Sequence, residues 1–344
     1  KFVYEENRCM ILAVNKVDKK TKLDEKGIIN KIYSLTPQIK GLPVHFISAK
    51  NKTGFDELIV RCGLNSNGPP IIDNYFDIHG KVKKEKLTLH GKIANLKADS
   101  VEIIVIPGSP TELVVIGDVY EPSIVNPKYK LTSRISTRVG SNYLLIEDEV
   151  LNATNIETEM ELLYHCNFGT PFLEEGAELV VAAKEVAPRD TNAAQGINEY
   201  ETYGSPIEGF SEQVYWYDLI ENQDGKNLVL LKNSSENIAV MMKFDKKQLP
   251  TFTQWKNTSS FAEGYVTGLE PGTDYPNSKA FERKCGRLLK LSPREKRSFN
   301  LTIEFLTNNT DVNIAIDEIS KMQHPVQRVV HKKPNKKFSD FENS

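Results

Sequence analysis

A change in hydrophobic period near residue 80 is the feature that most limits how this chain can fold. Beyond it, short runs of β-branched and aromatic residues follow one another, separated by turn residues. The runs include VEIIVI, ELVVIGDVY, YLLIED, QVYWYDLI, NIAVMMKF and FNLTIEFL. Closely spaced runs of this kind predict β-strands, and the scarcity of helical pattern between them predicts one large antiparallel β-sandwich. We expect it to span residues 76–324, so the chain should be mainly β.

The N-terminal region follows a different pattern, which predicts a small α/β fragment. CMILAVNKVD begins with a short apolar strand, residues 24–36 have one apolar helical face, and PVHFISAK is a second buried strand. Parallel strands joined by a helix are typical of α/β proteins. The sequence CGLNSNGPP then marks a boundary, because Gly, Asn, Ser and Pro favour turns. We therefore expect an α/β fragment at 1–62, a linker at 63–75, the sandwich, and an unstructured basic tail at 325–344.

Composition excludes several classes of protein. Apolar residues make up 39% and charged residues 26% of the 344 positions, as in soluble globular proteins. No apolar run approaches the roughly 20 residues of a membrane helix, so no membrane partner is expected. The net charge is −2, and because both ends of the chain are basic, its middle is acidic. Nucleic-acid binding depends on positive charges that neutralise phosphates, so an acidic middle region gives no reason to expect a nucleic-acid partner.

The spacing of the cysteines indicates a reducing compartment and argues against a metal-binding site. Cys9, Cys62, Cys166 and Cys285 are far apart in the sequence. No two of them have the close spacing of a zinc ligand set or a redox motif, so no metal is expected. Scattered thiols fit a reducing compartment and predict a cytoplasmic protein. The chain begins with Lys1 rather than Met, and we expect its true start to lie upstream.

Two short segments at the ends of the first two predicted strands carry a nucleotide-binding pattern. They are Asn15-Lys16-Val17-Asp18 and Ser48-Ala49-Lys50. The pairing resembles the base-specificity half of a translation-factor-class GTPase, especially the ribosome-assembly type. The resemblance implies that Asp18 binds guanine, that Asn15 braces the loop, and that the stem of Lys16 covers the base. It also implies that the backbone N–H of Ala49, next to Ser48, meets the guanine O6 atom.

The phosphate-binding half of such a GTPase is missing from the sequence. No GxxxxGK[ST] loop occurs, and that loop would supply backbone N–H groups to the phosphates and a hydroxyl to Mg²⁺. GTP binding is therefore not expected, and we interpret the segment as a remnant left by fusion or truncation. The alternative is a truncated GTP-binding ribosome-assembly factor, which would need the missing loop in an upstream region.

Four separated segments stand out in the predicted sandwich. They are 88–95 (TLHGKIAN), 163–169 (LYHCNFG), 209–213 (GFSEQ) and 268–276 (GLEPGTDYP). Their order and spacing resemble the aldose 1-epimerase, or galactose mutarotase-like, superfamily, in particular a bacterial branch with YHxNFG and GLEPGT segments. The resemblance covers about residues 75–305 and implies a galactose mutarotase-like supersandwich. It also implies an isomerase of carbohydrate metabolism that interconverts the anomers of a free sugar and needs no cofactor.

The same resemblance assigns roles to individual residues. Glu270 takes the place of the general base and His165 that of the general acid, a role that suits histidine because its ordinary pKa is near neutral. The family segment GRxxN, which binds sugar hydroxyls, is matched by GKIAN, giving Lys92 and Asn95 with Lys in place of the usual Arg. The remaining substrate-binding candidates are His90, Asn167, Glu212 and Trp255, and the indole could stack on a sugar ring.

Each of these residues also has a purely structural interpretation. His165 could be a packed core histidine, Glu270 a turn residue in Glu-Pro-Gly-Thr, and Trp255 a core aromatic. Lys92 in place of Arg, and the lack of a clear second family histidine, favour another function. That alternative is a non-catalytic carbohydrate-binding protein. A groove in which His165 and Glu270 meet would favour the enzyme.

Overall fold

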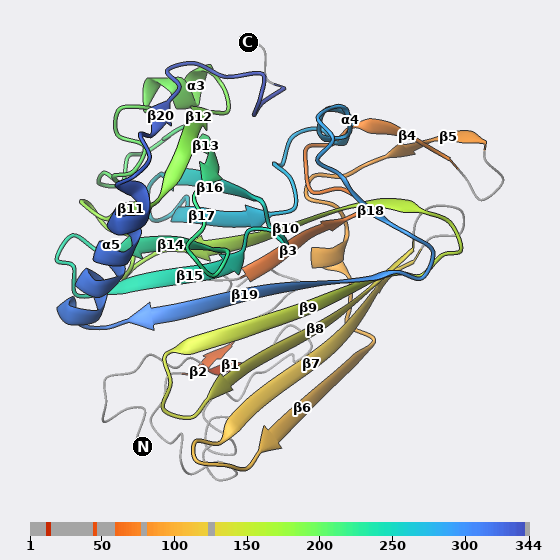
Figure 1. The fold of residues 1–344 in the computed structure, drawn as a ribbon, viewed down its shortest axis with the longest axis horizontal. Coiled ribbons are helices and arrows are strands. Elements are labelled where there is room, and N and C mark those ends of the chain that lie inside the picture. The colour runs from red at the N-terminus through yellow and green to blue at the C-terminus, as the bar shows by residue number, and fades with distance from the viewer. Residues whose placement is uncertain (1–11, 15–43, 47–58, 77–80, 123–127, 341–344) are drawn as a thin grey trace.

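The computed structural model describes residues 12–14, 44–46, 59–76, 81–122 and 128–340 (Figure 1). Within these residues, two eight-stranded sheets pack into a β-sandwich, which confirms the expected mainly β fold. Among the described helices, none is both long and apolar enough to cross a membrane.

The first sheet has the strand order β18-β10-β17-β16-β13-β12-β20, and β3 also pairs with β10. Its strands are β3 (Ile59–Leu64), β10 (Thr158–Phe168), β12 (Ala183–Pro188), β13 (Gln213–Leu219), β16 (Thr251–Thr258), β17 (Tyr265–Gly272), β18 (Leu289–Leu291) and β20 (Val329–Val330). Neighbouring strands are antiparallel, except that β20 runs parallel to β12. This sheet carries the candidate site.

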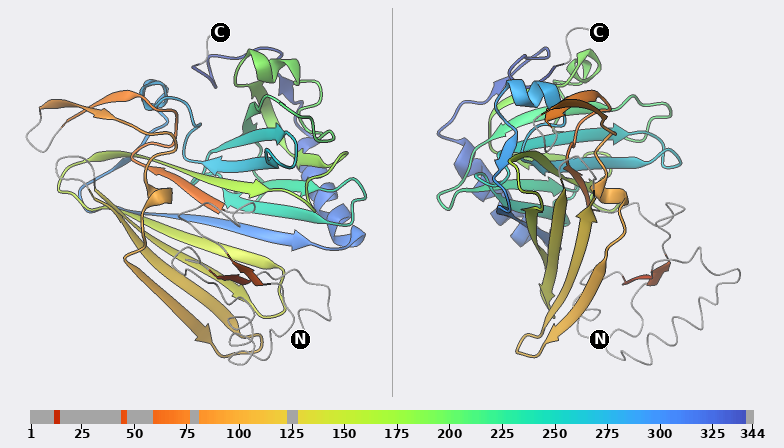
Figure 2. Two further views of the ribbon diagram at one scale, coloured as in Figure 1. Left: turned by 180° about the vertical axis from the view of Figure 1, so that it is seen from behind. Right: turned by 90° about the vertical axis from the view of Figure 1, so that its right-hand side faces the viewer.

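The second sheet has the strand order β11-β14-β15-β19-β9-β8-β7-β6 and is antiparallel throughout. Its strands are β6 (Ser100–Ile106), β7 (Glu112–Glu121), β8 (Tyr129–Arg138), β9 (Tyr143–Asn152), β11 (Glu178–Val181), β14 (Lys226–Lys232), β15 (Ala239–Asp245) and β19 (Lys296–Leu306). In both views of Figure 2, β6, β7 and β8 extend away from the rest of the sandwich.

The remaining elements are short, apart from one helix. They are β1 (Leu12–Val14), β2 (Val44–Phe46), β4 (Ile72–Phe76), β5 (Val82–Lys86), the 3₁₀ turn η3 (Ile93–Asn95), α3 (Thr191–Gln195), α4 (Lys279–Lys284) and α5 (Asn309–Gln323). β4 and β5 form an antiparallel hairpin. β1 and β2 pair in parallel, as expected for the two N-terminal strands. The helix predicted at residues 24–36 lies outside the described residues.

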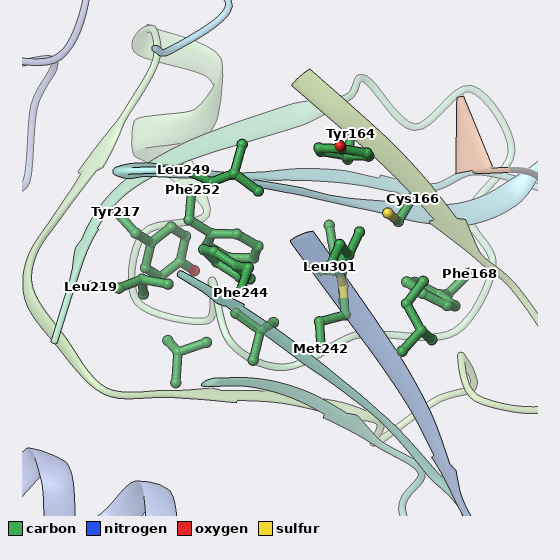
Figure 3. Close-up of a cluster of buried hydrophobic side chains, with 14 of the residues drawn as sticks. Tyr164, Cys166, Phe168, Tyr217, Leu219, Met242, Phe244, Leu249, Phe252 and Leu301 are labelled. Carbon is green, nitrogen blue, oxygen red and sulfur yellow. The ribbon is translucent and has the colours of Figure 1, made fainter. Parts of the chain in front are cut away.

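The main apolar core fills the space between the two sheets (Figure 3). β10 shows how a strand supplies both core and site, because successive side chains of a strand point to opposite faces. Tyr164, Cys166 and Phe168 point into the core. His165 and Asn167 therefore lie on the outer face of the same strand. Each large side chain buried in this core contributes about 1.5–3 kcal/mol to folding.

Helix α5 covers the outer face of the second sheet. Its residues Val312, Ala315 and Ile319 recur about one turn apart and share an apolar cluster with Leu228 of β14 and Met241 of β15. Apolar contacts on both faces explain why β14 and β15 are almost continuously buried. In Figure 1, α5 crosses the ends of these strands.

Strand β3 corrects the expected domain boundary. It pairs with β10 along its whole length, and Cys62 and Leu64 are buried in the sandwich. The next three residues, Asn65, Ser66 and Asn67, are buried as well. β3 therefore belongs to the sandwich rather than to the expected α/β fragment, and the expected linker at 63–75 begins inside the sandwich. Small polar residues give this segment the composition of a linker, but here the side chains of Asn65 and Asn67 hydrogen-bond to groups inside the fold.

Residues 325–340 pack against the sandwich, so the expectation of an unstructured tail is wrong for them. β20 adds to the first sheet, and Phe338 is buried in an apolar cluster that includes Trp216. Lys337 forms an ion pair with Glu185 on β12. The acidic body thus attracts the basic tail, and one aromatic side chain anchors it. Residues 341–344 lie outside the described residues.

Candidate active site

His165 and Glu270 meet across two neighbouring strands. β10 and β17 are antiparallel, with Cys166 opposite Leu269 and Asn167 opposite Gly268. This register places His165 directly opposite Glu270, so the two side chains share the outer face of the sheet. Nε2 of His165 lies 3.0 Å from Oε1 of Glu270. The structure therefore brings together two residues that are far apart in the sequence.

Gly268 forms the floor beneath this pair. It lies opposite Asn167 on β10 and opposite Trp255 on β16. A Cβ atom at this position would lie 2.5 Å from Oε1 of Glu270 and 2.9 Å from Cε1 of His165. Both distances are too short for a real contact, so the pair can occupy its position only above a glycine. Sequence analysis did not assign a role to Gly268.

Burial sets the protonation of both side chains. It raises the pKa of Glu270 to about 8 and lowers the pKa of His165 to about 4. Asn167 offsets part of the effect on His165 by hydrogen bonding. At neutral pH the 3.0 Å contact therefore joins a protonated carboxyl group and a neutral imidazole rather than two ions. At neutral pH the His165–Glu270 pair therefore holds a single proton, which either group can carry.

The contact of Glu270 with His165 is close but lacks hydrogen-bond geometry, so the carboxyl group keeps capacity for a hydrogen bond. Its side chain is 3% exposed, and within the described part of the chain Oε1 has no partner with hydrogen-bond geometry. Buried polar atoms in native proteins are almost always hydrogen-bonded. Oε1 of Glu270 is thus free to form a hydrogen bond with a bound molecule.

His90 is a third titratable side chain of the site. Its ring lies edge-on to that of His165, with centroids 5.6 Å apart. His90 also lies close enough to Glu270 for a positive charge on its ring to lower the pKa of that carboxyl group. The Nδ1 atom of His90 lies 2.8 Å from the carbonyl oxygen of Asn67, which can only accept. Nδ1 therefore carries the proton, and Nε2 of the neutral ring is a hydrogen-bond acceptor.

Trp255 and Glu212 form another part of the site. The indole ring centroid lies 5.6 Å from that of His165, with the planes inclined at 61°. Its N–H group donates to Oε2 of Glu212 at 2.6 Å, and Arg189 donates two hydrogen bonds to Oε1 of Glu212 at 3.2 Å. The ring of His165 thus contacts those of both His90 and Trp255. Sequence analysis missed Arg189, which no motif indicates.

Two predicted substrate ligands are not brought to the pair. Lys92 forms an ion pair with Glu85 of β5 at 3.0 Å, and Asn95 is exposed in η3. Among the described contacts, no hydrogen bond or ion pair joins either residue to His165 or Glu270. The substrate-binding role of Lys92 and Asn95 therefore remains a prediction, and in this structure the lysine pairs with Glu85 instead of the catalytic pair.

The predicted guanine pocket cannot be compared with the structure. Asn15, Lys16, Asp18, Ser48 and Ala49 lie outside the described residues. The GTPase remnant remains a prediction. In the part of the chain that is described, no group of three or more His, Cys, Asp or Glu side chains is arranged to hold a metal ion.

Comparison with known proteins places the chain in a family. Residues 48–305 match a family model described as a domain of unknown function, DUF4432. The chain belongs to this family. The match begins before β3 and ends within β19, so it includes both His165 and Glu270. A search of curated proteins finds no match.

Solved structures identify the fold of the DUF4432 domain. A protein from Klebsiella pneumoniae, provisionally named an aldose 1-epimerase, is 31% identical with a TM-score of 0.74 and covers 80% of this chain and 70% of its own. A galactose mutarotase-like protein from Clostridium acetobutylicum is 16% identical, has a TM-score of 0.50 and covers 84% of each chain. The galactose mutarotase-like sandwich expected from the sequence is thus confirmed.

Proposed function

We propose that this DUF4432 protein interconverts the α and β anomers of a free aldose or aldose derivative. The observation that carries the proposal is the contact of His165 Nε2 with Glu270 Oε1 at 3.0 Å on the outer face of the first sheet. The Klebsiella pneumoniae protein, whose provisional name is aldose 1-epimerase, supports it through 31% identity. A small sugar is accordingly the proposed partner.

The reaction needs one acid and one base. The base takes the proton of the hydroxyl on C1, and the acid gives a proton to the ring oxygen O5. The C1–O5 bond breaks, its electron pair stays with O5, and C1 becomes an aldehyde carbon. Rotation about the C1–C2 bond and reversal of these steps give the other anomer. Proton balance is kept, because one proton leaves the sugar and one enters it.

The His165–Glu270 pair supplies both functions from a single proton. The resemblance assigns the base to Glu270 and the acid to His165. Burial favours the opposite distribution in the absence of sugar, since the pKa of Glu270 is about 8 and that of His165 is about 4. The two assignments are tautomers of the same one-proton pair. Both therefore predict activity in the same range of pH.

The flanking residues provide contacts for the rest of the sugar. Nε2 of His90 can accept a hydrogen bond from a hydroxyl group, and so can the carboxylate of Glu212. Trp255 is half-buried and offers one ring face for the C–H groups of a pyranose. Arg189 holds Glu212 in place with two hydrogen bonds at 3.2 Å. These contacts orient a ring over the catalytic pair.

Polarimetry tests the proposal. Freshly dissolved α-galactose, α-glucose and other aldoses would be followed with the wild-type protein and with the Glu270→Gln variant. We expect the wild type to accelerate mutarotation of at least one sugar, and the variant to be about 10²–10⁴-fold slower. Sugar binding by both proteins without any acceleration would contradict the proposal and support the non-catalytic carbohydrate-binding alternative.

A further inference from the structure

The segment 63–68 holds His90 through three hydrogen bonds. The backbone N–H of His90 donates to the carbonyl of Gly68 at 3.1 Å, and its carbonyl accepts from the N–H of Gly63 at 3.1 Å. The ring donates from Nδ1 to the carbonyl of Asn67 at 2.8 Å. One segment therefore fixes both the backbone and the ring of a single histidine.

The backbone of His90 is held in a conformation that its side chain disfavours. Its φ is +57°, in the left-handed region, and the next residue, Gly91, has a φ of +70°. A Cβ on Gly91 would lie 2.1 Å from the carbonyl oxygen of Gly63. Backbone strain of this kind persists where the surrounding structure imposes it, and such positions cluster at functional sites. The surroundings here hold His90 against its local preference.

The side chain of Asn67 anchors this arrangement to the strand that bears Glu270. Its Nδ2 atom donates to Oδ1 of Asp274 at 3.2 Å, and both residues are fully buried. Asp274 lies two residues after the end of β17. Its Oδ1 also accepts from the hydroxyl of Thr273 at 2.6 Å, and that hydroxyl accepts from the N–H of Leu162 on β10 at 2.9 Å.

We propose that Asn67 and Asp274 are positioning residues that fix the tautomer of His90, leaving Nε2 as an unprotonated acceptor for a sugar hydroxyl. Asp274 holds the side chain of Asn67, and this places the Asn67 carbonyl against Nδ1. The role in sugar binding rests on the proposed function, whereas the fixed tautomer does not. Neither residue touches the reacting atoms.

Asparagine is the conservative replacement at position 274. Burial, together with the neighbouring carboxyl group of Glu161, raises the pKa of Asp274 well above its ordinary value. Its Oδ1 acts as an acceptor toward Asn67 and Thr273. The amide oxygen of asparagine can accept the same two bonds. Asp274→Asn should therefore preserve the tautomer of His90, whereas Asp274→Ala should not.

Asn65 provides a matched control on the same segment. It is buried and amide-bearing like Asn67, but its side chain donates to Glu85 and accepts from Lys279 instead of reaching Asp274. Asn65→Ala therefore loosens the segment without removing the bond to Asp274. A general loss of rigidity would affect both asparagine variants alike.

The test is an NMR measurement of the histidine tautomers in the full chain, labelled with ¹⁵N-histidine and assigned with His90→Gln. We expect wild-type His90 to carry its proton on Nδ1. Asn67→Ala and Asp274→Ala should give a mixture of tautomers, with mutarotation about ten- to a hundredfold slower. Asp274→Asn and Asn65→Ala should keep the wild-type tautomer.

Two results would overturn the inference. One is a wild-type His90 protonated on Nε2, which tests the proposal even where a variant does not fold. The other is an equal change of tautomer in Asn65→Ala and Asn67→Ala. The spectra need no sugar, so a protein without mutarotase activity but with the expected tautomers would refute the proposed function and leave the positioning role intact.

Discussion

Gly268 and Glu270 lie so close on the face of β17 that a Cβ at position 268 would be 2.5 Å from Oε1 of the carboxyl group. Gly268→Ala should therefore displace Glu270 or His165. We expect mutarotation to fall about 100-fold or more, because loss of acid–base geometry costs that much. Overpacking should also lower the unfolding free energy by about 1–3 kcal/mol. Polarimetry and urea unfolding measure the two effects.

Gly204→Ala is the matched control for this prediction. A Cβ at Gly204 would have nothing within 4 Å, and its φ lies outside the left-handed region. The variant should keep both activity and stability. Wild-type activity in Gly268→Ala would show that His165 and Glu270 do not require a glycine at position 268.

Activity should depend on pH in a defined way. The one-proton form of the pair exists between the pKa of His165, about 4, and the pKa of Glu270, about 8. Below this range both groups are protonated and no base remains, and above it neither holds a proton and no acid remains. The ratio kcat/KM, measured by polarimetry against pH, should fall at both ends. A rate independent of pH between about 3 and 10, after correction for the uncatalysed reaction, would contradict this account.

Stability should depend on pH through the same two groups. Glu270 binds its proton more tightly when folded, so its contribution to stability falls as pH rises from 4.5, the ordinary pKa of a glutamate, to about 8. His165 acts in the opposite sense between about 4 and 6.5, the ordinary pKa of a histidine. The two nearly cancel up to pH 6.5. Above that, stability should fall by about 1.4 kcal/mol per pH unit until pH 8.

Urea unfolding at pH 6.5 and pH 8 measures this change. Glu270→Gln cannot titrate and should lose the decrease, whereas Glu102→Gln, which alters an exposed carboxylate on β6, should retain it. The same slope in the wild type and in Glu270→Gln would show that the decrease has another origin.

The C-terminal segment should contribute to stability through one aromatic residue. Phe338 is 1% exposed and packs edge-on against Tyr275, with ring centroids 5.6 Å apart. Phe338→Ala should lower the unfolding free energy by about 3–5 kcal/mol. Lys333→Ala, an exposed change in the same segment, should alter it by about 0.5 kcal/mol or less. Equal changes of the unfolding free energy in the two variants would indicate that the C-terminal segment is unstructured.

The sequence predicted the parts of the molecule that depend on local pattern. Closely spaced runs of β-branched and aromatic residues, such as QVYWYDLI and NIAVMMKF, predicted the sandwich, because strand preference is a local property. His165 could be linked to Glu270 only through the motifs of a family. Their meeting depends on the register of β10 and β17, which no local pattern specifies.

The parts that sequence analysis missed depend on contacts between distant segments. Asn65 and Asn67 belong to a segment that has the composition of a linker, yet each side chain hydrogen-bonds to a buried partner far along the chain. The ion pair of Lys92 with Glu85 likewise joins two charges that no sequence motif links. Gly268 gave no signal of its own, because its role is the absence of a Cβ beneath two other side chains.

The central claim is that His165 and Glu270 act as one catalytic unit on a sugar. The most direct measurement is the polarimetric rate of aldose mutarotation for the wild type, Glu270→Gln, His165→Gln and the double variant. We predict acceleration by the wild type, a loss of about 100-fold or more in each single variant, and no further loss in the double variant. A wild type that does not accelerate mutarotation, or single losses that multiply in the double variant, would contradict the claim.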